Sequence, residues 1–134
     1  MRALRVSVRL VSLHAVLLAL ACAAPGGAQA QSLSSYQQSC NQIGVAGDTL
    51  FANCRRMDGG FTRTSIAIPG VSNNDGVLQF DGMRAPSTFQ NSCNHIGVAG
   101  STLFANCRRM DGGFSRTSIA IPGIANIDGR LRYQ

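Results

Sequence analysis

The chain has 134 residues, a formal net charge of +6, and twelve basic residues that are all arginine. No run of basic residues exceeds two, so the stripe of Lys and Arg with interleaved aromatic residues that is typical of nucleic-acid binders is absent. Outside the first thirty residues, nine arginines face six aspartates, a mild excess that indicates a solvated, soluble surface.

Residues 1–30 have the pattern of a secretory signal peptide. Three arginines in the first nine residues precede an apolar run over 11–24, and Ala28 and Ala30 are small residues at the positions that a signal peptidase reads. The run is shorter than the ~20 residues that a membrane span needs. We therefore expect cleavage after Ala30, no transmembrane segment, and a secreted or periplasmic protein.

An alternative processing route starts at Cys22. Residues 19–22 read A-L-A-C, which resembles a lipoprotein cleavage box, so a lipid anchor at Cys22 competes with plain secretion. In either case Cys22 leaves the folded domain, which then holds four cysteines.

The rest of the chain is an internal repeat. Residues 38–80 and 91–133 align without a gap at an offset of 53, and 33 of the 43 positions are identical. Two equal copies should present two similar surfaces, which suits a bivalent binder better than an enzyme with one asymmetric site. We expect one domain at 31–134, made of two repeats at about 33–80 and 87–134 that are joined by a linker at 81–86.

In chain order, the first repeat opens with a short helical turn over 34–39 that begins at a serine. Leu50, Ala52 and Cys54 then alternate with the residues at 51, 53 and 55, and this period of two predicts a half-buried strand. The turn sequence Asp-Gly-Gly at 58–60 follows.

A second strand is predicted over 61–68, and Pro69-Gly70 ends it. The Asp-Gly pair at 75–76 predicts a turn before a last strand over 77–80. The second repeat has the same pattern, with its helical turn at 87–92. Gly and Pro in the linker indicate a hinge, so we expect a monomer that can exchange halves to form a domain-swapped dimer.

The four remaining cysteines are Cys40, Cys54, Cys93 and Cys107, and disulfides are expected in an exported chain. Repeat symmetry excludes none of the three connectivities. We expect local pairing, Cys40–Cys54 and Cys93–Cys107, with each bridge worth about 3 kcal/mol. A zinc site would need a C-x-x-C pair, which is missing, and His95 is the one histidine after the signal, so no metal is predicted.

The sequence lacks the residue combinations that common hydrolytic enzymes use. Nucleophilic hydrolysis needs a nucleophile beside a base, and one histidine with bonded cysteines does not supply it. Glycoside hydrolysis needs a pair of carboxylates, but the chain has no Glu and most aspartates lie in turns. The N-x-D-G segments at 73–76 and 126–129 lack the glutamate of a calcium loop. We predict no enzyme activity and no cofactor.

The whole chain after the signal resembles the cyanovirin-N homolog family. The resemblance rests on the tandem repeats of about fifty residues, the R-x-x-G-G turns after the second cysteine of each copy, and the closing N-x-D-G-x-L segments, above all A-N-I-D-G-R-L-R-Y at 125–133. It implies a mostly β, pseudo-symmetric fold of two intertwined halves. Each half would hold a three-stranded sheet plus a hairpin, with short helical turns between them.

The resemblance also implies a mannose-binding lectin with two pockets. The first pocket would use Gln38, Ser39, Arg55, Arg56, Met57, Asn126 and Asp128. The second would use Asn91, Ser92, Arg108, Arg109, Met110, Asn73 and Asp75. The two sets are related by the same offset of 53, position for position. Arg55 and Met57 stand where the founding lectin has an acid and a threonine, and Met110 replaces an arginine.

Two functions follow as expectations. The first is a lectin that binds mannose-type oligosaccharides, free or on glycoproteins, non-covalently and without a metal. The alternative is a disulfide-stapled protein-interaction module on the same scaffold, favoured by the Arg-Arg-Met sequence present in both copies. Phe51 and Phe104 can either stack on a sugar ring or pack against neighbouring loops, and we expect packing against the loops.

Overall fold

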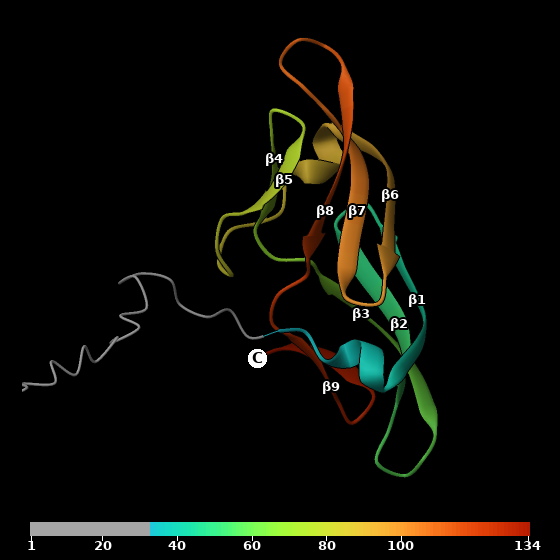
Figure 1. Ribbon diagram of the computed structural model, residues 1–134. Coiled ribbons are helices and arrows are strands. Elements are labelled where there is room, and N and C mark those ends of the chain that lie inside the picture. The colour runs from blue at the N-terminus through green and yellow to red at the C-terminus, as the bar shows by residue number, and fades with distance from the viewer. Residues whose placement is uncertain (1–32) are drawn as a thin grey trace, which may run out of the picture.

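The computed structural model describes residues 33–134 (Figure 1). The predicted signal peptide, its cleavage after Ala30 and the alternative at Cys22 lie outside the described residues. The first repeat forms η1 (Tyr36–Gln38), β1 (Cys40–Ala46), β2 (Thr49–Arg55), β3 (Phe61–Ala67), β4 (Val71–Asn74) and β5 (Val77–Phe80). The second forms η2 (Phe89–Asn91), β6 (Cys93–Ala99), β7 (Thr102–Arg108), β8 (Phe114–Ala120), β9 (Ile124–Ile127) and β10 (Arg130–Tyr133).

The fold is mostly β and consists of two intertwined halves, as predicted. In what we call the first half, the antiparallel sheet β1-β2-β3 packs against the hairpin β9-β10 of the other repeat. In the second half, the sheet β6-β7-β8 packs against the hairpin β4-β5. The hairpins are attached by equivalent hydrogen bonds: Leu131 N–H donates to Thr64 Oγ1 at 3.1 Å and Leu78 N–H donates to Thr117 Oγ1 at 3.0 Å.

The predicted alternation is confirmed in the strands that precede and follow the Asp-Gly-Gly turn. Leu50, Ala52 and Cys54 are buried on one face of β2. In β3, every second residue is more buried than its neighbours. The short helical turns and the strand at 77–80 also lie where they were predicted.

Two strands of each repeat escaped prediction. In β1 a bulge shifts the register between Asn41 and Gly44, and Gln42 has a φ of 49°, so the strand shows no simple alternation. β4 is only four residues long, which is too short for a period-two pattern to emerge.

Both disulfides are local, as predicted. Cys40 bonds Cys54 and Cys93 bonds Cys107, each across a directly paired position of adjacent strands. The bridges join β1 to β2 and β6 to β7, so each clamps the edge strand of its sheet.

Buried serines attach each repeat to the other. Ser34 Oγ donates to the carbonyl of Ile121 and accepts the N–H of Ile124 at 3.0 Å. Ser87 makes the equivalent pair with the carbonyl of Ile68 and the N–H of Val71. Around them, the core is built from both repeats, with Tyr36, Phe89, Leu50, Leu103, Ile68 and Ile121 among its fully buried side chains.

Phe51 and Phe104 pack on the sheet itself. The Phe51 ring lies over Gly44, its cross-strand partner, so closely that a Cβ on Gly44 would come within 2.4 Å of the ring. Phe104 covers Gly97 in the same way. Both rings therefore pack against strand glycines, whereas the sequence led us to expect neighbouring loops.

No helix within residues 33–134 is long and apolar enough to cross a membrane.

Candidate functional site

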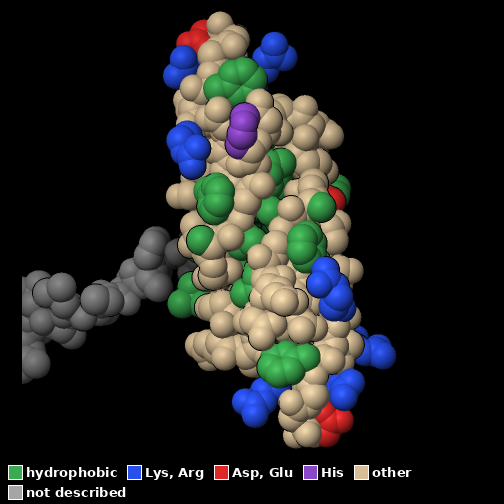
Figure 2. Space-filling view, turned by 90° about the vertical axis from the view of Figure 1, so that its right-hand side faces the viewer, with side chains coloured by type: hydrophobic (Ala, Val, Ile, Leu, Met, Phe, Trp, Pro, Cys, Tyr) green, Lys and Arg blue, Asp and Glu red, His purple; other side chains and the backbone are tan. Residues whose placement is uncertain are grey.

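The predicted site residues gather at the two ends of the molecule. The turn between β2 and β3 lies at one end and the turn between β7 and β8 lies at the other (Figure 1). On the face shown in Figure 2, basic side chains lie beside acidic ones at both ends, and hydrophobic side chains are spread along the whole length between them. Each long turn meets the short hairpin of the other repeat. We call these two places the first end (β2–β3 turn) and the second end (β7–β8 turn).

At the first end, the turn of the β9-β10 hairpin holds the β2–β3 turn through its carboxylate. Asp128 Oδ1 accepts the backbone N–H of Met57 at 2.9 Å. Asp128 is exposed, and its Oδ2 accepts no hydrogen bond from any residue in 33–134. One carboxylate oxygen is therefore fixed by the protein and the other is available to solvent or to a ligand.

Asn126 uses its whole amide within the protein. Its Nδ2 donates to Ser39 Oγ and to the carbonyl of Arg55, both at 2.9 Å. Its Oδ1 accepts the N–H of Gly129 at 2.8 Å. Both amide hydrogens are thus committed. This side chain brings η1, β2 and β9 together, and so positions the site.

The second end repeats this arrangement at the offset of 53 residues. Asp75 Oδ1 accepts the N–H of Met110 at 2.8 Å. Asn73 donates to Ser92 Oγ and to the Arg108 carbonyl at 2.9 Å, and accepts the N–H of Gly76 at 2.8 Å. The structure therefore brings together equivalent parts of both predicted sets.

The arginines of the two sets divide into two kinds. Arg56 is turned back into its own turn, where Nε donates to Asp58 at 3.2 Å and one terminal nitrogen donates to Thr62 Oγ1 at 3.3 Å. Arg109 makes the same contacts with Asp111 and Ser115. Arg55 is exposed at the end of β2, and its equivalent Arg108 is exposed at the end of β7.

The turn carboxylates are held in their charged form. The pKa of Asp58 lies below its ordinary value because the Gly60 N–H and then the Arg56 side chain donate hydrogen bonds to it. The pKa of Asp111 is lowered by the same contacts from Gly113 and Arg109. The sequence marked these aspartates as turn residues, but their part in holding the arginines depends on the folded turn.

A close approach explains the glycine after each site aspartate. Asp128 and Gly129 have φ values of 50° and 84°, as a two-residue type I′ hairpin turn requires. A Cβ on Gly129 would lie 2.6 Å from Arg56 Cγ. At the second end, Gly76 lies against Arg109 in the same way.

Gln38 and Asn91 complete the predicted sets. Each is exposed at the last position of its 3-10 turn, directly before the serine that the site asparagine holds. The structure places both beside the sites without assigning either side chain a hydrogen bond within residues 33–134.

An exposed methionine lies at each end of the molecule. The hairpin turns beside the two methionines differ in the residue that precedes the aspartate. Met57 is 87% exposed and Met110 is 86% exposed. Beside Asp128 stands Ile127, which is 55% exposed, whereas Asn74 stands beside Asp75 and donates to Gln79 at 3.1 Å. The first end is thus more apolar than the second.

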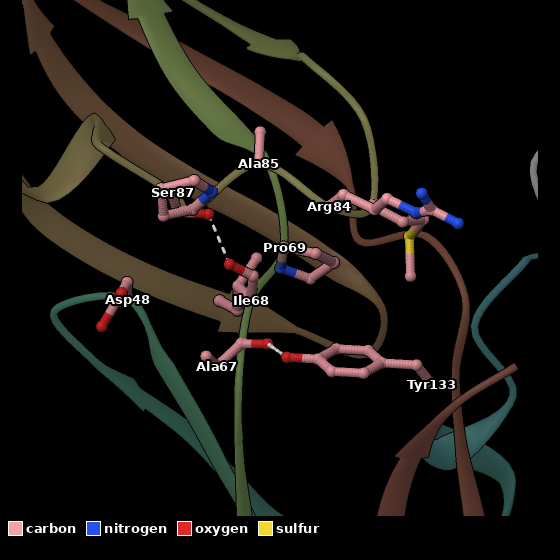
Figure 3. A pocket seen from close by; sticks show the side chains of 10 residues that line it. Asp48, Ala67, Ile68, Pro69, Arg84, Ala85, Ser87 and Tyr133 are labelled. Carbon is pink, nitrogen blue, oxygen red and sulfur yellow. Dashed lines mark hydrogen bonds between the residues drawn. The ribbon is translucent and has the colours of Figure 1, made fainter.

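A separate hollow of about 260 Å³ lies at the linker (Figure 3). Tyr133 Oη donates to the Ala67 carbonyl at 2.5 Å along one side, and Ser87 bonds Ile68 along the other. Arg84 points away from Asp48, which lies across the hollow behind Ile68 and Pro69 (Figure 3). The polar groups that line this hollow are used mainly in hydrogen bonds between the two repeats.

Within residues 33–134 no group of three or more His, Cys, Asp or Glu side chains is placed to hold a metal ion.

Comparison with solved structures gives the same fold. The chain is similar to TbCVNH from T. borchii, with 29% identity, a TM-score of 0.62, and coverage of 75% of this chain and 99% of that one. It is similar to microvirin in a complex with mannobiose, with 26% identity, a TM-score of 0.56, and coverage of 76% and 100%. A MoCVNH3 variant in complex with (N-GlcNAc)4 has 19% identity, a TM-score of 0.64, and coverage of 78% and 99%, and it shows the fold alone.

The sequence profile of the CVNH domain matches residues 36–132, which span both repeats, both disulfides and both ends described above. With its crossed halves and its paired N-x-D-G turns, the chain belongs to the cyanovirin-N homologue (CVNH) family.

Proposed function

We propose that this protein is a lectin that binds mannose-type oligosaccharides non-covalently through related sites at its two ends. Membership of the CVNH family supports carbohydrate binding, and so does the likeness to microvirin, whose solved complex holds mannobiose. In this proposal the protein forms hydrogen bonds to the sugar and breaks no covalent bond, so it needs neither a catalytic residue nor a cofactor.

The observation that carries the proposal is the half-fixed carboxylate at each end. The Met57 N–H aligns Asp128 through Oδ1, which leaves Oδ2 as a preoriented, exposed acceptor. Neighbouring hydroxyls of a sugar donate and accept hydrogen bonds, and a bond to a charged acceptor is the stronger kind. Asp75 offers the same acceptor at the second end.

The nearby side chains supply the complementary donors. Gln38 and Arg55 at the first end, and Asn91 and Arg108 at the second, are exposed and can donate to hydroxyl or ring oxygens. We assign Asn126 and Asn73 to positioning, because their amide hydrogens are already bonded inside the protein.

Asp128→Asn and Asp75→Asn test the proposal. Asparagine keeps the shape and one acceptor for the methionine N–H, but it removes the charge. Since a hydrogen bond to a charged group contributes about 1.5–3 kcal/mol, each substitution should weaken its own site roughly tenfold or more. In calorimetric titration with mannobiose, the native protein should show two strong sites, each single variant one strong site, and the double variant no strong site.

Unfolding midpoints of the variants close to that of the native protein would show that the loss is local. Native protein that binds no mannose disaccharide would sink the proposal, as would a double variant that binds as well as the native protein.

A second function, a protein-interaction module, is favoured by one observation. Each end presents an exposed methionine beside an exposed arginine, a surface that suits protein contacts. Capture of a partner that competing mannose does not disturb, and that added salt weakens, would support this alternative.

A further inference from the structure

One groove of the first half is unlike its counterpart in the second. An open hollow of about 400 Å³ lies between β3 and β10 and is lined by Thr62, Arg63, Thr64, Ser65, Arg130, Leu131 and Arg132. We call it the arginine groove. Its volume lies in the range of about 300–1,000 Å³ that is common for small-ligand sites. It lies on the flank of the first half and includes none of the proposed mannose-site residues.

None of the three arginines of the groove forms an ion pair with a carboxylate of residues 33–134. Among residues 33–134 the guanidinium–carboxylate ion pairs are Arg56–Asp58 and Arg109–Asp111 alone. Arg63, Arg130 and Arg132 are all exposed and belong to two different sheets. All three therefore line one hollow, and no ion pair within residues 33–134 neutralises them.

The groove is also held in shape. Leu131, between the two β10 arginines, is buried and its N–H donates to Thr64 Oγ1 at 3.1 Å, which fixes β10 against β3. The guanidinium carbon of Arg63 lies 5.8 Å from the centre of the Phe51 ring, within cation–π distance. The Phe51 ring is itself seated on Gly44.

The second half provides an internal comparison. At the positions that match Arg130 and Arg132, β5 has Val77 and Gln79. Gln79 donates a hydrogen bond to Asp81 at 3.0 Å. The counterpart of Asp81 in the second repeat is the neutral Gln134. The equivalent hollow beside β8 is lined by Phe104, Arg116, Thr117 and Ser118, so it has a single arginine. The divergence of the two copies has concentrated positive charge in one groove.

We propose that the arginine groove binds an acidic saccharide and reads its sulfate or carboxylate groups. Guanidinium groups donate paired hydrogen bonds that match such oxyanions, and the Thr and Ser hydroxyls of the lining suit the sugar hydroxyls beside them. The inference rests on the proposed lectin function for the saccharide part of the ligand. The binding of the anion itself is independent of it.

A nucleic acid fits the groove less well. Single-stranded binders combine a basic track with exposed aromatic rings on which bases stack. Here none of the residues that line the groove is aromatic, and the Phe51 ring beside Arg63 packs between that arginine and Gly44. Three charges around one hollow also match one or two anionic groups better than a continuous phosphate backbone.

Exchanging residues between the repeats tests the inference. Arg130→Val/Arg132→Gln gives the groove the residues of its counterpart, and Val77→Arg/Gln79→Arg/Asp81→Gln gives the counterpart those of the groove. The probe is a sulfated heparin-type tetrasaccharide, titrated calorimetrically at low ionic strength. We expect one site on the native protein, affinity reduced about tenfold in the first variant, and two sites in the second.

Three controls test whether binding depends on the groove arginines, on the sulfate groups and on the saccharide. Arg84→Gln/Arg116→Gln removes two arginines elsewhere and should leave the affinity within about twofold, since more distant exposed charges are screened. The desulfated tetrasaccharide, which keeps its carboxylates, shows which anion is read. A single-stranded oligonucleotide of equal charge that binds as tightly as the sulfated probe would overturn the assignment to saccharides.

Mannobiose is titrated into the same samples. Arg130→Val/Arg132→Gln should bind mannobiose normally, because it gives the first end the residues Val and Gln that the second end already has at these positions. A native protein that binds mannobiose but not the sulfated probe contradicts the groove alone, and the reverse result contradicts the proposed mannose sites alone. Unchanged affinity for the sulfated probe in the Arg130→Val/Arg132→Gln variant would also overturn the inference.

Discussion

Single polar side chains in this protein join segments that lie far apart in the sequence. Tyr36 Oη donates to the Gly100 carbonyl at 2.6 Å and so ties the 3-10 turn of the first repeat to a turn of the second. Ser87 satisfies two buried backbone groups of the other repeat. For Tyr36 the second copy provides a natural comparison, because Phe89 occupies the equivalent position without a hydroxyl.

Tyr36 should make stability depend on pH in the alkaline range. Burial raises the pKa of Tyr36 from its ordinary 10.0 to about 12, so folding favours the protonated phenol. This contribution is fully present below about pH 10 and is lost as the pH rises toward 12. Urea unfolding at about pH 8 and pH 11 should show a loss of stability that is smaller in Tyr36→Phe. Equal losses in both proteins would contradict this assignment.

Ser87→Ala should destabilise the fold by about 1–3 kcal/mol, because it leaves the Val71 N–H and the Ile68 carbonyl buried without their partner. Ser72→Ala is the matched control, since the second repeat has Ala125 at that position, and it should cost less than about 0.5 kcal/mol. Urea unfolding measures both variants. A Ser87→Ala protein as stable as its control would show that the serine is not required.

At the scale of elements, what the sequence predicted followed from local patterns. β2 was predictable because every second residue from Leu50 to Cys54 is buried, and the β4-β5 turn was predictable because Asp-Gly suits its positive φ values. β1 was not, because its bulge interrupts the alternation. The residues at each end could be carried over by resemblance. That Asn126 bonds inside the protein depends on strands of both repeats meeting, which no local pattern contains.

The hairpin turn of each site should tolerate no side chain at its second position. Gly129→Ala would strain a φ of 84° and push the new Cβ against Arg56, so Asp128 should shift away from the Met57 amide. We expect a loss of about 1–3 kcal/mol in urea unfolding and a marked change in the Met57 amide chemical shift. Met110, at the second end, should keep its native shift. A native-like Met57 signal would contradict this role for Gly129.

At the scale of the whole molecule, neither repeat contains the hairpin that covers its own sheet. The β1-β2-β3 sheet needs β9-β10, and the β6-β7-β8 sheet needs β4-β5. A repeat of about fifty residues is also close to the lower limit for burying an adequate core. The two disulfides reinforce each sheet but do not join the repeats.

Fragments 33–83 and 84–134 should therefore be unfolded separately and fold when mixed. Each fragment alone exposes the apolar face of a sheet, whereas the pair restores both crossed packings. Far-UV circular dichroism should show coil for either fragment and a native-like β spectrum for the equimolar mixture. Either fragment folding cooperatively as a monomer would refute the interdependence of the repeats.

Because the hairpins are crossed, each end of the molecule combines a turn from one copy with a tail from the other copy. The tip of each long hairpin comes from one copy, and the strands that face it come from the tail of the other. Six of the ten differences between the copies lie in these tails, while the Arg-Arg-Met-Asp-Gly-Gly tips are identical. With this connectivity, a few substitutions in one tail can change one end of the molecule without changing the other. An engineer can do the same, using the tails as short exchangeable cassettes that retarget one end and leave its twin unaltered.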